Sequence, residues 1–516
     1  EGAGTVVLKN LEKALADSDP VWAVIDSLHA SAGLNGPSVS DDANRALNDQ
    51  NLGVEDLDLM ELSMSPNPDH HELHFEEIRK LLKEDKGEIP VLKRWALSST
   101  QANLGHAGAA AGMLSLIKTS LCLHHRVLPG WPDWSPPPEP QENSTSLFVP
   151  AASIPWLKDE TGLPRRAGIS LAGRDGCSSH VIVSESDRNS GFSSTPRPGD
   201  WKLLPVAGNG RDGLLQKLSQ LDKDWDPTNS PERFLDRAFR SYSEDSATHA
   251  ACILFDSPDQ LLREIRAVQE GVHGAFESGR DWKTPGGSSF SPNPLGSEGS
   301  IAFAYPGGFN SYVGCGRGLF EMDPALYERI STYTKKLKNL LHPEFLYPQS
   351  LHPLGEEELR GVQDSFYQSP NPMFESGITS AVLATQVMRH AFGIEPSSAF
   401  GYSMGEVSML FSLGVWGSMD SMSEVLNASP LFLERIAGPM NAVREAWKLE
   451  DDEYRNEPLW SWHTLRASSK TVEDELQNHK RVYLVLINSP MEAVIAGEPS
   501  ACEAFIRKLQ CESRQI

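Results

Sequence analysis

The sequence predicts an α/β protein of two or three domains, in which short apolar strands alternate with helices. Its 516 residues are enough for more than one hydrophobic core, and 39% hydrophobic residues with a mean hydropathy of -0.36 are typical of a soluble globular chain. The last part of the chain contains a strand, a glycine-rich loop, a long helix, a second strand, a Gly-x-Ser-x-Gly turn and a further helix. This order predicts an α/β hydrolase-like core with a parallel sheet.

Charge and cysteine content exclude several functional classes. The formal net charge of -24 argues against nucleic acid or an anionic membrane as a partner, because both require a basic face. No apolar run reaches the roughly 18 residues that a membrane span needs. The six cysteines lack CxxC or zinc-ligand spacing, which favours reduced thiols in a cytoplasmic protein without a metal site. The chain opens with Glu1 rather than Met, and a helical pattern continues from Phe505 to Ile516 without a stop signal, so we expect both ends to be cuts through a longer polypeptide.

The first predicted domain covers residues 1–186. Apolar runs predict strands at Thr5–Lys9 and Val21–Asp26 and an apolar-rich segment at Gly53–Leu62, and periodic apolar residues predict helices at Leu11–Ala16, His71–Leu82 and Ala107–His124. The last of these helices carries Ala and Gly at successive turns. Small residues allow a neighbouring element to approach closely, so we expect this helix to be buried.

Several motifs of this domain resemble the C-terminal half of a β-ketoacyl synthase of the thiolase-like fold. They are Asn103-Leu-Gly-His106, the small-residue run Ala109–Gly112 with Leu116–Lys118, the opening Glu1–Lys9, and Gly168–Val181. The resemblance implies that the nucleophilic cysteine of such enzymes belongs to the N-terminal half of the domain, which this sequence does not include.

Three positions depart from the pattern of active synthases. Ser63 stands where the family has the histidine that hydrogen-bonds the malonyl thioester carbonyl, and Gln101 stands where a lysine orients the second histidine. Arg174 aligns with the phenylalanine that gates the acyl site. Serine cannot replace imidazole at the thioester without a changed geometry. The domain therefore resembles a chain-length factor, the decarboxylation-incompetent partner of an active ketosynthase, and we interpret the remaining His106 as structural.

The second predicted domain, residues 187–297, is a small α/β unit between two loops rich in Ser, Pro and Gly. Its predicted strands are Lys202–Ala207 and Ala250–Asp256, and its predicted helices are Asp212–Leu221 and Ser257–Gly271. It fits the linker found between ketosynthase and acyltransferase modules, and we assign it no chemistry.

The third predicted domain, residues 298–516, contains Gly401-x-Ser403-x-Gly405, the pattern of a nucleophile elbow. In such an elbow a serine sits on a tight turn between a strand and a helix, and side chains at the glycine positions would crowd the turn. The context fits, with a strand at Ser300–Tyr305, a helix at Phe374–His390 and a helix at Val407–Gly414.

The same domain resembles acyl-carrier-protein acyltransferases of the malonyl-transacylase family. The resemblance rests on the glycine-rich loop after Pro306, on the elbow, and on Asn488-Ser-Pro before Ala493–Gly497. It implies that Ser403 attacks an acyl thioester and passes the acyl group to a phosphopantetheine thiol, with backbone N–H groups of Met404 and Gly308 as the oxyanion hole. The resemblance also implies that no cofactor is bound and that coenzyme A or the phosphopantetheine arm of an acyl-carrier protein acts as co-substrate. The family usually has glutamine at 308, and a glycine can donate the same backbone N–H.

Departures in this domain bear on the acyl substrate. Tyr402 replaces the usual histidine before the nucleophile, and Ala428 replaces the arginine that pairs with the malonyl carboxylate. We also assign Asn488 to the substrate pocket. Arg435 could substitute for that arginine only if the helix shifted. We therefore expect a neutral fatty acyl substrate rather than malonyl. The catalytic histidine is expected beyond Ile516, so neither His463 nor His479 is nominated, and the chain is expected to stop inside a ferredoxin-like subdomain that begins near Val482.

The order of the predicted domains is similar to that in polyunsaturated fatty acid synthases and, more broadly, in iterative polyketide synthases. It implies acyl-carrier-protein domains, an active ketosynthase domain and acyl-CoA as partners, and a dimer. Two alternatives stay open at this point. The first is a serine thioesterase that releases free fatty acid from Ser403, which Ala428 would permit. The second is a non-catalytic scaffold in which both enzyme-like domains are degenerate.

Overall fold

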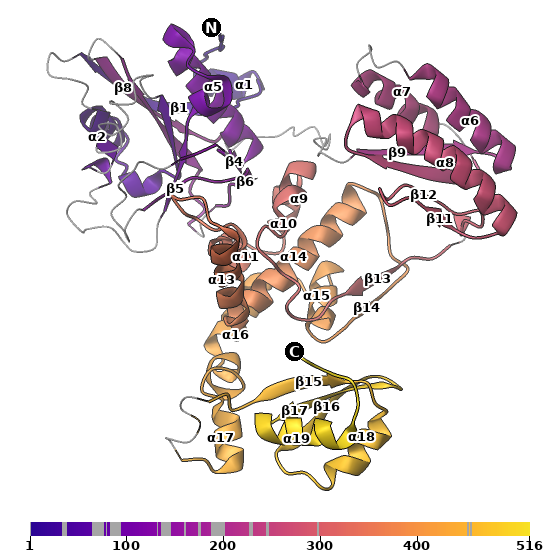
Figure 1. The fold of residues 1–516 in the computed structure, drawn as a ribbon. Coiled ribbons are helices and arrows are strands. Elements are labelled where there is room, and N and C mark those ends of the chain that lie inside the picture. The colour runs from indigo at the N-terminus through magenta and orange to yellow at the C-terminus, as the bar shows by residue number, and fades with distance from the viewer. Residues whose placement is uncertain are drawn as a thin grey trace. The chain divides into compact units, whose positions relative to one another are not determined.

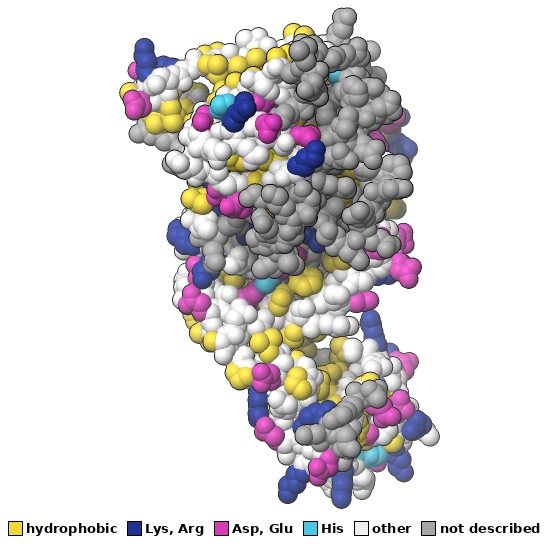
Figure 2. All heavy atoms as spheres, turned by 90° about the vertical axis from the view of Figure 1, so that its left-hand side faces the viewer, with side chains coloured by type: hydrophobic (Ala, Val, Ile, Leu, Met, Phe, Trp, Pro, Cys, Tyr) yellow, Lys and Arg dark blue, Asp and Glu magenta, His cyan; other side chains and the backbone are white. Residues whose placement is uncertain are grey.

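We describe the chain from a computed structural model. The described residues are 2–32, 39–63, 77–78, 80–82, 94–131, 133–135, 146–158, 161–173, 177–186, 202–225, 231–243, 247–296, 299–450, 454 and 457–516. Contacts divide the chain into two compact units, Glu1–Glu424 and Val425–Ile516, and each is described separately (Figure 1). Among the described helices none combines the length and the apolar character that crossing a bilayer requires. On the face drawn in Figure 2, acidic side chains are interspersed with basic and hydrophobic ones.

A six-stranded mixed sheet organises the first part of unit one (Figure 1). Its strands, in spatial order, are β1 (Val24–Ala32), β8 (Cys177–Ser184), β7 (Arg166–Ala172), β2 (Leu59–Ser63), β3 (Trp95–Ser98) and β5 (Leu147–Phe148). The run β7-β2-β3-β5 is parallel, whereas β8 pairs antiparallel with both β7 and β1. Every residue of β2 is buried, as is typical of a parallel strand covered on both faces.

The two faces of this sheet are covered by different helices. Met60 and Leu62 belong to one hydrophobic cluster with Ala46 of α2 (Val39–Asp49), whereas Leu59 belongs to another with Leu123 of α5 (Ala111–His125). This alternation follows from the two-residue period of a strand. Two short helices precede α5: α4 (Thr100–Leu104) and the 3₁₀ turn Gly108–Ala110. Helix α1 (Leu11–Ala16) and the strand pair β4 (Val127–Leu128) and β6 (Ile154–Pro155) complete this part.

The predicted strand at Thr5–Lys9 is wrong. These residues form no regular element, and Val7 and Leu8 are 94% and 72% exposed. An apolar run becomes a strand only where another strand satisfies its backbone hydrogen bonds, and residues 5–9 pair with none of the described strands. Strand β1 begins at Val24, three residues later than predicted. The predicted helix His71–Leu82 lies mostly outside the described residues.

The second sheet is antiparallel, with the order β11 (Trp282–Lys283), β12 (Ser289–Phe290), β10 (His249–Phe255) and β9 (Lys202–Gly208). Its helices are α6 (Gly210–Asp224), α7 (Pro231–Ser243) and α8 (Pro258–Ser278). Both predicted strands and both predicted helices of this part are present, and α7 was missed. Helix α8 continues through Gly271, where it was expected to stop. A Cβ atom there would lie 2.0 Å from Trp282, so the glycine makes room for the indole instead of ending the helix.

The third part of unit one has a parallel pair of strands, β13 (Ala302–Tyr305) and β14 (Ser398–Gly401), in which Tyr305 is paired with Gly401. The predicted parallel arrangement is therefore confirmed for this pair. Helices α14 (Pro370–His390) and α15 (Met404–Ser412) pack together beside it. The remaining helices are α9 (Arg317–Met322), α10 (Leu326–Ile330), α11 (Leu337–Leu341), α12 (Pro343–Leu346) and α13 (Glu356–Tyr367), and helix α16 (Met419–Ala428) contains the boundary between the two units.

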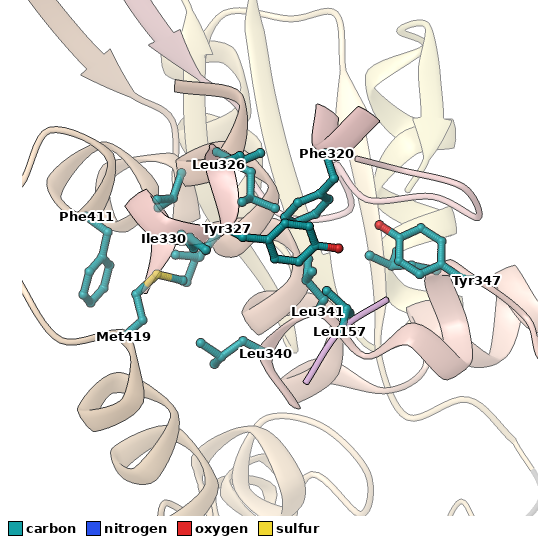
Figure 3. Close-up of a cluster of buried hydrophobic side chains, with 14 of the residues drawn as sticks. Leu157, Phe320, Leu326, Tyr327, Ile330, Leu340, Leu341, Tyr347, Phe411 and Met419 are labelled. Atoms are coloured by element: carbon teal, nitrogen blue, oxygen red, sulfur yellow. The ribbon is translucent and has the colours of Figure 1, made fainter. Parts of the chain in front are cut away.

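One hydrophobic cluster joins the first and third parts of unit one. Figure 3 shows Leu157, from the ketosynthase-like segment, beside Tyr327, Phe320 and Leu341 of the third part. The Tyr327 hydroxyl donates to the carbonyl oxygen of Arg126 at 3.1 Å, and burial raises the pKa of this phenol well above its usual value. These contacts explain why the two segments fall into one compact unit.

Unit two contains a four-stranded antiparallel sheet in the order β16 (Val482–Ser489), β17 (Glu492–Gly497), β15 (Ser461–Leu465) and β18 (Ser513–Gln515). Helix α18 (Ser469–Leu476) follows β15 and α19 (Pro499–Leu509) follows β17, which gives the β-α-β-β-α-β order of a ferredoxin-like fold. Helix α17 (Asn441–Trp447) precedes the sheet.

Two predictions about unit two are wrong. The ferredoxin-like subdomain begins at Ser461 and not near Val482, and the described residues include four strands of that topology. Strand β15 was not predicted because its buried side carries polar residues; His463, for example, is 7% exposed. The helical pattern expected from Phe505 to Ile516 ends at Leu509, because Gln510 adopts a left-handed conformation at the helix end.

Candidate functional site

Ser403 lies on a strained turn between β14 and α15. Its φ of 53° and ψ of -121° are rare for a residue with a side chain, and its position caps the N-terminus of α15. The side chain is exposed. Strand, turn and helix follow one another as the Gly-x-Ser-x-Gly pattern predicts. The geometry is that of a nucleophile elbow, while the role of Ser403 stays a prediction.

The two flanking glycines are required by close backbone approach. A Cβ atom on Gly401 would lie 2.2 Å from the backbone of Gly405, and one on Gly405 would lie 2.2 Å from the carbonyl oxygen of Tyr305. The Tyr402 N–H donates to the same Tyr305 oxygen at 3.1 Å. The turn therefore lies tightly against the end of β13. A side chain at Gly405 would push the turn away from β13, and one at Gly401 would clash with the first residues of α15.

The glycine-rich loop after β13 lies directly against Ser403. A Cβ atom on Gly307 would lie 3.0 Å from the Tyr402 ring and 3.5 Å from Cβ of Ser403. At Gly308 the nearest atoms to an added Cβ would be 3.7 Å away, which is ordinary van der Waals contact. The change to glycine at 308 is therefore not forced by crowding.

Two backbone donors near Ser403 are available to a ligand. Within the described part of the chain, neither the N–H of Met404 nor that of Gly308 has an acceptor. Met404 is the first residue of α15, where the N–H groups lack helical partners and the helix dipole favours negative charge. An oxygen that gains negative charge beside Ser403 would be stabilised by these groups, which is the arrangement expected for an oxyanion hole.

The predicted pocket residues Ala428 and Asn488 belong to unit two, whereas Ser403 belongs to unit one. Ala428 is the last residue of α16, and the Asn488 side-chain amide on β16 donates to Glu492 at 2.8 Å. Their roles stay predictions. Arg435 was expected on the same helix as Ala428, and that is wrong. The helix ends before Ser429-Pro430, because the residue preceding a proline disfavours helical geometry, and Arg435 lies on the separate turn Leu431–Arg435.

The predicted remnants of a ketosynthase site lie at one edge of the first sheet. Ser63 ends β2 and is 8% exposed, and Gln101 lies on α4, just after the parallel neighbour β3. His106 is exposed, and its Nδ1 accepts a hydrogen bond from the Gly108 N–H at 3.1 Å. This hydrogen bond places His106 in a local turn, and the structural role assigned to His106 stays a prediction. Arg174 lies outside the described residues.

Sequence reasoning missed a buried carboxylate at this edge. Glu61, in the middle of β2, is fully buried and accepts hydrogen bonds from Thr100 Oγ1 at 2.6 Å and Ser115 Oγ at 3.2 Å. The Lys118 ammonium lies 3.4 Å from the other Glu61 oxygen and donates to Ser98. The sequence signal was a glutamate within a mainly apolar strand. Because a buried carboxylate needs partners, this glutamate could have predicted a buried polar cluster.

A second missed residue is Phe309, next to Gly308. It has a φ of 63°, which is unusual for a bulky side chain, and it remains 57% exposed. The signal in the sequence was a phenylalanine at the position where the resembled loop has its second glycine.

A third missed feature is the pair of the half-buried His342 and the buried Glu375, whose Nε2 and Oε2 atoms are 2.6 Å apart. Glu375 lies on α14 and also accepts a hydrogen bond from Ser423 of α16. Neither residue belongs to a sequence motif that we recognised.

A family model matches the first part of the chain, and curated relatives are similar to nearly all of it. Residues 28–133 match the family of β-ketoacyl synthase C-terminal domains. Over 99% of its length the chain is 28% identical to a polyunsaturated fatty acid synthase chain of Thraustochytrium sp., and 25% identical to a phenolphthiocerol/phthiocerol polyketide synthase chain of Mycobacterium tuberculosis. The chain spans 26% and 22% of the lengths of these curated relatives.

Two solved structures align with parts of this chain at low sequence identity. The acyltransferase domain from module 8 of the salinomycin polyketide synthase aligns with 62% of this chain and 66% of its own, at a TM-score of 0.42 and 14% identity. The ketosynthase from module 6 of the bacillaene synthase of Bacillus subtilis aligns with 51% of this chain and 48% of its own, at a TM-score of 0.31 and 21% identity. The chain is therefore similar over nearly its whole length to polyunsaturated fatty acid and polyketide synthases, and its residues 28–133 match the β-ketoacyl synthase C-terminal domain.

Proposed function

We propose that this chain transfers acyl groups within a fatty acid or polyketide synthase, through an acyl ester on Ser403. The observation that carries the proposal is the strained turn at Ser403, which lies against the loop of Gly307 and Gly308. The N–H of Gly308 on this loop and the N–H of Met404 at the start of α15 have no acceptor among the described residues. Strain of this kind is maintained only where the surrounding structure enforces it, and it collects at reactive sites.

The reaction proceeds in two balanced steps. Ser403 Oγ attacks the carbonyl carbon of an acyl thioester, its proton passes to a general base, and the thiol of coenzyme A leaves with a proton. The thiol of a phosphopantetheine arm then attacks the acyl-serine ester and restores the serine. The resemblance implies a histidine as the base. The two backbone N–H groups stabilise the oxyanion in both steps.

The proposed substrate is a neutral fatty acyl group, and the proposed partners are acyl-carrier-protein domains and an active ketosynthase. Ala428 cannot pair with a malonyl carboxylate, because its methyl side chain carries neither charge nor donor. The ketosynthase-like segment is proposed to act as a chain-length factor, since Ser63 and Gln101 replace two catalytic groups of that family.

A serine-directed probe tests the nucleophile in the full-length polypeptide. We expect an alkyl fluorophosphonate to label the wild type, and Ser403→Ala to lower the labelling rate by at least about 1,000-fold. Ser397→Ala, which removes an exposed serine that bonds to the Ile301 carbonyl oxygen, serves as the matched control and should label normally. Equal labelling of Ser403→Ala and wild type would identify a different serine, and unlabelled wild type would favour the scaffold.

A second assay separates transfer from hydrolysis. The full-length polypeptide is incubated with a radiolabelled fatty acyl-CoA and a holo acyl-carrier protein, and protein-bound and free acyl groups are counted. We expect the label to appear on the carrier protein and to disappear in Ser403→Ala. Release of free acid without any carrier-bound product would contradict the transferase proposal and support a thioesterase.

A further inference from the structure

Phe309 adopts a backbone conformation that its side chain disfavours. Its φ of 63° lies in the left-handed region, which suits glycine and is uncommon for a bulky residue. Such strain is usually offset when the side chain fills a core. Here Phe309 is 57% exposed, so burial within the described structure offsets little of this strain. The conformation therefore presents an apolar ring to the surroundings at a local energetic cost.

Contacts on two neighbouring helices hold Phe309 in this conformation. Its N–H donates to Met373 Sδ of α14 at 3.2 Å. One side of its ring meets Tyr367, the last residue of α13, edge to face, with 5.4 Å between the ring centroids and an interplanar angle of 84°. That geometry is favourable for aromatic pairs. The ring is therefore fixed in place rather than left to rotate freely.

The loop that carries Phe309 lies against Ser403. Gly307, two residues earlier, lies against the Tyr402 ring and Cβ of Ser403. Tyr402 is itself 51% exposed. One exposed aromatic residue thus directly precedes the serine, and another, Phe309, lies on the loop that contacts the serine through Gly307 and supplies the Gly308 N–H. Exposed apolar surface beside a reactive group is where a hydrocarbon substrate gains most by burial.

We propose that Phe309 is a specificity-determining residue that packs against the alkyl chain of the acyl group on Ser403. The inference rests on the proposed acyl role of Ser403 and adds a residue that selects long chains over short ones. A long chain covers the exposed part of the ring, and this burial offsets the strain at Phe309. A two-carbon acyl group has little apolar surface to bury, so it gains little from the ring.

Chain-length selectivity of serine labelling tests the role of Phe309. Ethyl and hexadecyl fluorophosphonates are reacted with the full-length polypeptide; in each case Ser403 Oγ bonds to phosphorus and fluoride leaves. The ratio of the two second-order rate constants measures chain selection without requiring acyl transfer. We expect the wild type to favour the long probe, and Phe309→Ala to lower the ratio about 10-fold. This is the fold-change expected when roughly half of a phenyl ring is buried from water.

Three further variants separate the effect of the Phe309 ring from the effect of backbone strain at this position. Phe309→Leu keeps an apolar side chain and should lower the ratio by about threefold or less. Phe309→Gly should lower it as much as Phe309→Ala, yet unfold a few degrees higher than Phe309→Ala because glycine adopts a positive φ without strain. Phe392→Ala is the matched control: it removes a phenylalanine that is 54% exposed just after α14 and should leave the ratio unchanged.

The outcomes distinguish this inference from the proposed function. A ratio that is the same in wild type, Phe309→Ala and Phe309→Gly overturns the role of Phe309 and leaves a reactive Ser403 in place. Release of free acid in place of transfer overturns the transferase, while a ratio that still depends on Phe309 supports the inference. Absence of labelling by either probe in the wild type overturns both.

Discussion

Gly405→Ala is expected to lower the free energy of unfolding of unit one by at least about 3 kcal/mol and to abolish fluorophosphonate labelling of Ser403. The added Cβ would lie 2.2 Å from the Tyr305 carbonyl oxygen and 2.8 Å from that of Pro306. Both atoms are backbone, so they cannot rotate away as a flexible side chain would. The loop would have to move away from the turn, and the Gly308 N–H would move with it. Urea denaturation and the labelling rate measure the two effects.

Gly361→Ala is the matched control for this prediction. Gly361 lies inside α13, and an added Cβ there would meet nothing within 4 Å. Alanine favours the helix over glycine, so we expect a gain of up to about 1 kcal/mol and normal labelling. Wild-type stability and labelling in Gly405→Ala would contradict the close approach of turn and loop.

Raising the pH from 6.5 to about 9.5 is expected to destabilise unit one by about 3 kcal/mol through His342 alone. Burial lowers the pKa of this imidazole, but hydrogen bonds and charge from Glu344 and Glu375 outweigh burial and raise it to about 9. A folded-state pKa above the unfolded value near 6.5 means that the stabilisation is fully present below pH 6.5. It is lost as the pH rises through 9, where the folded protein also releases the proton.

His342→Asn tests this prediction. His342 has a φ of 51°, and asparagine tolerates that conformation while it removes the imidazole. We expect a loss of about 3 kcal/mol at pH 6.5, because Glu375 is 2% exposed and is left without its cationic partner. Urea midpoints from pH 6.5 to 9.5 should fall in the wild type and stay nearly flat in the variant. Parallel profiles for the two proteins would contradict the assignment to His342.

Glu344→Gln is the control that separates the two carboxylates. The Glu344 side chain is 58% exposed, whereas that of Glu375 is 3% exposed, so solvent screens the first pair far more than the second. We expect Glu344→Gln to lower stability by less than about 1 kcal/mol and to retain most of the pH dependence. A loss as large as that of His342→Asn would mean that the exposed carboxylate dominates.

Local patterns in the sequence were sufficient to predict the elements that carry the candidate site. The apolar run before the elbow predicts β14, and the glycines at 401 and 405 predict a turn too tight for side chains. Both features depend on residues within a few positions of one another. The same reasoning located α14, α15 and the strands β9 and β10, because burial on one face imposes a period on neighbouring residues.

Predictions failed where burial and local pattern disagree. Thr5–Lys9 has the composition of a strand but no partner among the described strands, and β15 has a partner but carries Ser461 and His463 on its buried side. Gly271 was predicted to end a helix, yet it lies inside α8. A glycine is needed there because Trp282 occupies the space that a side chain would fill. In each case the structure depends on contacts, present or missing, with residues outside the local pattern.

The sequence by itself determined that this protein is α/β, that a serine stands on a tight turn between a strand and a helix, and that its segments resemble a ketosynthase half and an acyltransferase. Only the tertiary structure decided which groups meet: Phe309 with Tyr367, Glu61 with Lys118, and His342 with Glu375. The physical reason is that hydrophobic periodicity records which face of an element is buried. It does not record which partner covers that face, and the partner depends on the packing of the whole unit.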